Sequence, residues 1–153
     1  MKRIAFVLVL AAAACQTVPV STTSAPTGVA ATGGASPRDA VDRFLAAARA
    51  QDIQALGAMF GNDQGPLRDH ADRRMIERQL MIQLQCLRHD KAVVSAPSHG
   101  SGGTQIFTVD MTQGALTASP HFTVIRGPEN RWYVEVFEIV ALQNKGFCSR
   151  PAP

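Results

Sequence analysis

The spacing of apolar residues changes once along this chain, near Asp90, and this change constrains the fold most. From residue 36 to residue 89, apolar side chains recur every three or four positions, as on one face of a helix. After Asp90 come short β-prone segments separated by Gly, Ser and Pro. Helices followed by antiparallel strands predict an α+β domain, in which the helices cover the apolar face of the sheet.

Three helices are predicted before that change. The first starts at residues 36–39, where Ser36 can cap the free amides and a proline suits the first turn. The second follows a capping Asp52 and ends at a loop, residues 61–66. The third spans about residues 72–89 and has the clearest periodicity. Its apolar stripe consists of Ile76, Leu80, Leu84 and Leu87, with Met75, Ile82 and Cys86 beside it.

Four strands are predicted after Asp90, at residues 92–96, 105–112, 120–126 and 131–142. Residues 127–130 fit a hairpin loop, so the last two strands should be antiparallel neighbours. Strict alternation in the last strand divides its side chains between two faces. It places Trp132, Val134 and Val136 on one face and Tyr133, Glu135, Phe137 and Ile139 on the other.

This order of elements, with the stretches SPRDAVDRFLAAARAQDIQALGAMF and RWYVEVFEI, resembles the nuclear-transport-factor-two-like family, also called SnoaL-like or cystatin-like. The resemblance extends from Ser36 to about Phe147. It implies one domain over residues 36–150, with three N-terminal helices packed on a curved antiparallel sheet that forms a cystatin-like cone.

Residues 1–14 have the layout of a secretory signal peptide. Lys2 and Arg3 precede eleven apolar residues, Ile4 to Ala14, which are too few to span a bilayer, since that takes about 20. Without these two basic residues, thirteen basic and twelve acidic side chains remain, so no nucleic-acid partner is expected. Residues 15–35 carry no charge and are rich in Thr, Ser, Gly and Pro, which predicts a flexible linker.

The end of the signal, LAAAAC, resembles the lipobox of bacterial lipoproteins. The resemblance implies that Cys15 carries a diacylglyceryl group and that a further acyl chain such as palmitate modifies its new amino group, an anchor of several chains. Gln16 after the cysteine implies sorting to the outer membrane, on the periplasmic side. An ordinary secretory signal cut near Ala14, which leaves a soluble periplasmic protein, is the alternative.

The two other cysteines, Cys86 and Cys148, form an even pair in a compartment that would be oxidising. We expect a disulfide between the end of the third helix and the tail of the domain. Two buried free thiols, or a redox pair without a Cys-x-x-Cys motif, are the alternatives.

The cone-fold resemblance implies a search for an acid or base in the cavity, because isomerases and dehydratases of that family work in this way. The candidates are Asp110, His121, Tyr133 and Glu135. Asp110, His121 and Glu135 also fit solvent-facing positions of alternating strands. Tyr133 also fits a core position, with its ring buried and its hydroxyl in contact with water. We therefore assign no catalytic residue. The sequence has no recognised catalytic motif, and its histidines are too scattered to predict a metal site or a cofactor.

The resulting hypothesis is a lipid-anchored protein of the cell envelope whose domain binds a small apolar ligand or an envelope protein without catalysis. A small cofactor-free isomerase or dehydratase is the alternative. A structural role as a homodimer, formed through an exposed sheet face, is a third.

Overall fold

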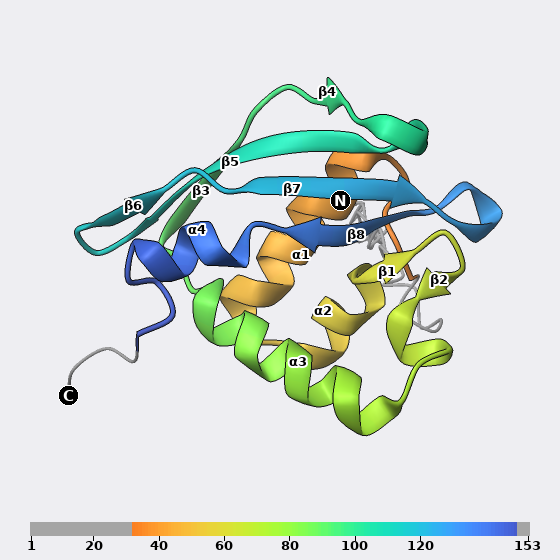
Figure 1. Ribbon diagram of the computed structural model, residues 1–153, viewed down its shortest axis with the longest axis horizontal. Helices are drawn as coiled ribbons and strands as arrows, with labels where there is room; N and C mark the ends of the chain where they lie inside the picture. Colours follow the sequence, from red (N-terminus) through yellow and green to blue (C-terminus); the bar gives the residue numbers. More distant parts are fainter. Residues whose placement is uncertain (1–31, 150–153) are drawn as a thin grey trace, which may run out of the picture.

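The computed structural model describes residues 32–149, which form an α+β fold. Helices α1 (Pro37–Ala50), α2 (Ile53–Met59) and α3 (Arg73–Cys86) come before a six-stranded antiparallel sheet that does not close. A fourth helix, α4 (Ile139–Asn144), follows the last strand. Figure 1 shows α1, α2 and α3 together on one side of the sheet. The predicted signal peptide, Cys15 and most of the predicted linker lie outside the described residues.

The predicted helix starts are confirmed, and in each a side-chain oxygen accepts hydrogen bonds from free backbone amides. Ser36 Oγ accepts from Asp39 N at 3.1 Å. Asp52 Oδ1 accepts from Gln54 N and Ala55 N, both at 3.0 Å. The α3 cap is Asp72, whose Oδ1 lies 2.8 Å from Met75 N. Local capping chemistry therefore determines where all three helices begin.

The sheet has the strand order β3 (Lys91–Val94), β5 (Gln105–Gln113), β7 (His121–Arg126) and β8 (Trp132–Phe137). These strands correspond to the four predicted ones. Two short strands that were not predicted, β4 (Ser98–His99) and β6 (Leu116–Ala118), pair with the two ends of β5. The predicted loop at residues 61–66 also contains a small hairpin of β1 (Gly61–Asn62) and β2 (Gly65–Pro66).

The prediction for the last strand is wrong in its length and in its alternation. β8 ends at Phe137, and the chain turns at Glu138 into α4, so Ile139 lies in a helix. Val124 pairs with Val134 while Thr123 pairs with Val136, which leaves Glu135 in a bulge. The bulge reverses the faces after Val134. Phe137 is therefore buried and Val136 is 54% exposed.

Four phenylalanine rings hold the helices against the sheet. Phe44 of α1 lies 6.3 Å from Phe60, 6.1 Å from Phe122 and 5.9 Å from Phe137, measured between ring centroids. Phe122 and Phe137 stack at 5.4 Å across β7 and β8. Such ring pairs stabilise a core beyond the area that they bury.

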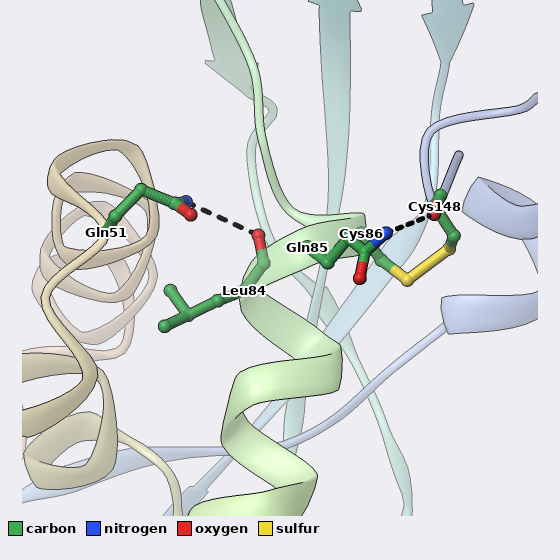
Figure 2. The surroundings of a disulfide bond; sticks show 5 residues. All are labelled: Gln51, Leu84, Gln85, Cys86 and Cys148. Atoms are coloured by element: carbon green, nitrogen blue, oxygen red, sulfur yellow. Dashed lines mark hydrogen bonds between the residues drawn. A yellow bond between two sulfur atoms is a disulfide. The ribbon is translucent and has the colours of Figure 1, made fainter. Parts of the chain in front are cut away.

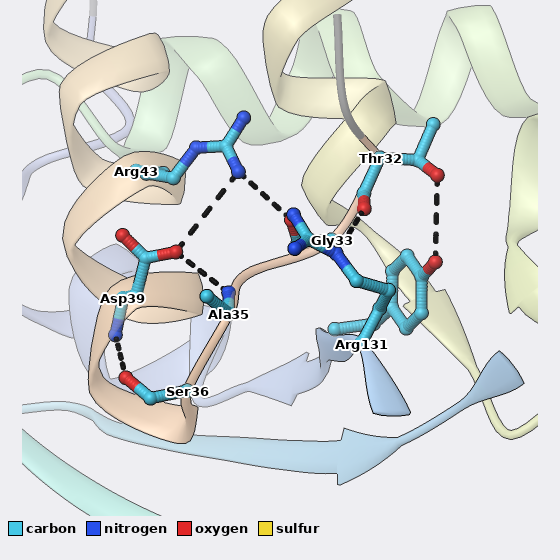
Figure 3. Close-up of polar contacts among 8 residues, drawn as sticks. Thr32, Gly33, Ala35, Ser36, Asp39, Arg43 and Arg131 are labelled. Carbon is cyan, nitrogen blue, oxygen red and sulfur yellow. Dashed lines mark hydrogen bonds and ion pairs between the residues drawn. The ribbon is translucent and has the colours of Figure 1, made fainter. Parts of the chain in front are cut away.

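Thr32 to Ala35, which the sequence assigns to the linker, pack against the domain (Figure 3). Gly33 N donates to Ala58 O at 2.9 Å, and Gly34 pairs with Trp132 at the edge of β8. Arg131 donates from Nε to Thr32 O at 3.0 Å, and also to Gly33 O. A Cβ at Gly34 would lie 2.3 Å from Ala40 N, so only glycine fits there. The packed part therefore starts before Ser36.

A disulfide joins Cys86, at the end of α3, to Cys148, after α4 (Figure 2). The predicted pairing is confirmed. Gln85 Nε2 donates to Cys148 O at 3.0 Å, so a hydrogen bond lies beside the covalent link. The disulfide therefore fixes α4 and the chain end beside the C-terminal end of α3.

We expect that replacing both cysteines, Cys86→Ser with Cys148→Ser, lowers the free energy of unfolding by about 4 kcal/mol, because the unfolded chain regains the entropy of an open loop. Urea denaturation of the oxidised protein and of the double variant measures this difference. If the double variant is as stable as the oxidised protein, the link is not a structural one.

Candidate functional site

The structure places the four candidate residues apart. Asp110 and His121 lie on the face of the sheet that α1 does not cover, and both are exposed. Asp110 Oδ1 accepts a hydrogen bond from Ser119 Oγ at 2.6 Å. His121 Nδ1 lies 3.1 Å from Glu138 Oε2. Asp110 and His121 therefore each have a partner of their own.

The contact between His121 and Glu138 joins the start of β7 to the turn that leads into α4. The His121 backbone N–H donates to Glu138 Oε2 at 3.0 Å, and Glu138 N donates back to His121 O. The pKa of Glu138 lies below its usual range. The main cause is the hydrogen bond that its carboxylate accepts from the His121 backbone N–H, and the second cause is the hydrogen bond with the His121 side chain. A general acid for neutral pH needs a raised pKa, so this carboxylate suits a structural contact.

Tyr133 is buried, with 2% of its surface exposed. Its ring packs against Gly33, Gly61 and Gly127, and its hydroxyl lies 3.5 Å from Thr32 Oγ1. Tyr133 thus holds the N-terminal segment against β8.

Glu135 is half-buried and borders a pocket of about 430 Å³ between α3 and the end of β8. We call this pocket the α3–β8 groove. Most of its surface is apolar, although four of its lining side chains are polar or charged. Its lining consists of Phe60, Met75, Arg78, Gln79, Ile82, Gln83, Glu135, Val136, Phe137 and Ile139.

Three apolar side chains of the groove face solvent. Met75 is 58% exposed, Ile82 is 55% exposed and Val136 is 54% exposed. The first two lie seven residues apart on α3, beside the stripe that enters the core, and the third faces outward because of the bulge. Contiguous exposed apolar surface of this kind marks interaction sites.

Gln83 is the buried polar residue of this groove. It is 6% exposed, and its Oε1 has no hydrogen-bond partner among the described residues. A buried acceptor without a donor costs free energy, and its presence at a pocket needs an explanation. Gln83 was not singled out from the sequence, because its burial depends on how α3 packs in the folded chain rather than on its neighbours along the helix.

A second pocket of about 780 Å³ lies over the outer face of the sheet beside α4. It shares Val136, Phe137 and Ile139 with the α3–β8 groove, so both pockets border the end of β8 and the start of α4. Val140 extends the apolar surface there, with 61% of its surface exposed.

Among residues 32–149, no group of three or more His, Cys, Asp or Glu side chains could hold a metal ion. No helix in this range has the length and apolar character needed to cross a membrane.

No protein-family model, curated protein or solved structure matches this chain.

We expect Gln83→Met to raise the free energy of unfolding by about 1 kcal/mol, because methionine fills the same space without an unpaired acceptor. Gln79→Met is the matched control, since Gln79 lines the same groove but is exposed. Thermal and urea denaturation measure both. A Gln83→Met protein that is less stable than the native one would show that Gln83 is satisfied.

Proposed function

We propose that this chain is a lipid-anchored protein of the bacterial cell envelope whose domain binds a ligand in the α3–β8 groove without catalysis. The observation that carries the binding role is the groove itself, which Met75, Ile82 and Val136 line with exposed apolar surface. Apolar pockets with a few polar groups are the usual form of small-ligand sites.

The anchor is supported by the sequence of residues 1–16 alone. A charged start, a short apolar run and the segment LAAAAC fit a signal peptide followed by a lipid-modified Cys15. Under this proposal the protein sits in the outer membrane and faces the periplasm. The disulfide between Cys86 and Cys148 fits that oxidising compartment.

A cone-shaped domain of the nuclear-transport-factor-two-like kind is part of the same proposal. It is supported by the order of the elements, with three helices ahead of the sheet strands, and by the antiparallel pairing of β3, β5, β7 and β8.

One observation favours the enzymatic alternative, namely that Glu135 lines an apolar groove, the kind of place in which a catalytic carboxylate is found. Asp110, His121 and Tyr133 do not line that groove. A binding function needs no second acid or base, and we therefore prefer it.

The anchor is tested with Cys15→Ser. We expect the variant to leave the membrane fraction of bacteria and to lack the mass of the lipid, because Cys15 supplies the sulfur that carries it. Fractionation and intact-protein mass spectrometry give both results. If the Cys15→Ser variant stays in the membrane fraction and its measured mass still exceeds the mass of its polypeptide by that of the lipid, the lipid is not attached to Cys15.

The groove is tested with Ile82→Arg, which places a charge among its apolar side chains. Met81→Arg is the matched control, because Met81 is 57% exposed on the same helix but does not line the groove. We expect native mass spectrometry of protein isolated from bacteria to detect a retained ligand on the native and Met81→Arg proteins, and none on Ile82→Arg. Equal loss or equal retention in the two variants would remove the groove as the site.

A further inference from the structure

The solvent-facing side of α3 is both apolar and basic. Met75, Met81 and Ile82 are 58%, 57% and 55% exposed. Arg74 and Arg78 are also exposed, and neither forms an ion pair within residues 32–149. At about 100° per residue, these five positions fall within one arc of about 120° around the helix. We call this arc, formed by Arg74, Met75, Arg78, Met81 and Ile82, the α3 outer face.

The α3 outer face has a net positive charge. The acid next to it on the helix is Glu77, whose Oε1 lies 2.8 Å from Arg73 Nε, so these two charges offset each other. Across the α3–β8 groove lies Glu135, which is half-buried. Two exposed arginines therefore stand against one half-buried carboxylate, and the face attracts anions.

We propose that the α3 outer face docks on an anionic lipid bilayer, with its three apolar side chains among the head groups and its two guanidinium groups at lipid phosphates. Apolar and basic residues together are typical of helices that lie in the plane of a membrane surface. The inference rests on the proposed function, because the lipid on Cys15 brings the domain to the membrane. Met75 and Ile82 also line the α3–β8 groove, so docking places the groove against the lipid.

The chain between the proposed anchor and the domain is long enough for this contact. Residues 16–31 join Cys15 to Thr32, the first described residue. A segment of this length reaches at most about 55 Å, and a domain of this size has a diameter of about 35 Å. Every face of the domain can therefore reach the bilayer, and the chemistry of each face determines which one docks.

The other faces of the domain fit an anionic bilayer less well. On α1, exposed charges form pairs, such as Arg38 Nε and Asp42 Oδ2 at 3.0 Å. None of the large exposed apolar side chains of residues 32–149 lies on α1 or α2. The pocket over the outer face of the sheet exposes Val140, but Glu138 lines the same pocket and would be repelled by anionic lipid.

A second copy of this chain fits the α3 outer face less well than lipid does. A symmetric dimer brings the same patch of both protomers into contact. Arg74 and Arg78 would then face two arginines of the other protomer, and like charges across an interface repel each other. Lipid phosphates, in contrast, complement both arginines.

The experiment uses native methionines as reporters of contact. The full chain is isolated from bacterial membranes and reconstituted into vesicles of phosphatidylcholine, alone or mixed with anionic phosphatidylglycerol. Hydrogen peroxide, a neutral oxidant, converts exposed methionine to the sulfoxide, and peptide mass spectrometry gives the rates for Met75 and Met81. We expect both rates to fall at least about fivefold in the anionic vesicles, because two arginines near an anionic surface favour docking by about thirtyfold. Buried Met59 and Met111 should stay unoxidised, which verifies the fold.

Three variants assign this protection to the α3 outer face. Arg74→Gln with Arg78→Gln should oxidise equally fast in both kinds of vesicle, because the attraction to phosphate is lost. Lys91→Gln with Arg126→Gln is the matched control, since it removes the same charge from exposed positions of the sheet, and it should match the native protein. Val93→Met adds a reporter at a position that is 48% exposed on the outer face of the sheet, and its rate should not depend on the lipid.

Vesicle flotation separates this inference from the proposed function. If the protein floats with both kinds of vesicle but Met75 and Met81 oxidise equally fast in them, the inference is overturned while the anchor stands. It is also overturned if the arginine double variant keeps the protection, or if Val93→Met is protected to the same extent. If the protein floats with neither, the anchor fails and the inference fails with it.

Two further outcomes are informative. Flotation with the anionic vesicles alone, with Met75 and Met81 protected, would support the docking face and remove the anchor. Equal oxidation in both kinds of vesicle, combined with slow oxidation in native bacterial membranes, would overturn the inference in favour of a protein partner.

Discussion

The packing of Phe44 against three other rings is the contact on which the rest of the structure depends. It joins α1 to the residue after α2 and to the ends of β7 and β8. Two of its partners, Phe60 and Phe137, also line the α3–β8 groove. The groove is therefore bounded by residues of the core itself, and its floor should be as rigid as that core.

The bulge at Glu135 allows one strand, β8, to place both Val134 and Phe137 in the core. Val134 and Phe137 both enter the core, although they are three residues apart in β8 and strict alternation would separate them. The extra residue restores Phe137 to the inner face and turns Val136 outward. One local irregularity thus completes the aromatic cluster and also exposes apolar surface at the groove.

Local signals predicted the parts of the fold that depend on local chemistry. Ser36, Asp52 and Asp72 determine the helix starts within three residues of themselves, and β5 and β7 alternate along their length. Helix α4 was missed because its six residues continue an apolar run and are too few to show a helical period. The small residues Gly33 and Gly34 suggested a linker, yet they are small because the chain passes close to the Tyr133 ring at Gly33 and close to α1 at Gly34. The groove was not predictable, since α3 and β8 meet only in the folded chain.

The position of the disulfide also affects how the domain would respond to proteolysis. Cys86 and Cys148 enclose the whole six-stranded sheet and α4 within one covalent ring. A single cut in any loop between these strands opens the ring but releases no fragment, because both pieces stay joined through sulfur. The strands of a molecule that has been cut once can then stay paired. In a compartment rich in proteases, the disulfide thus protects the sheet against loss of a fragment, whatever the stability of the sheet.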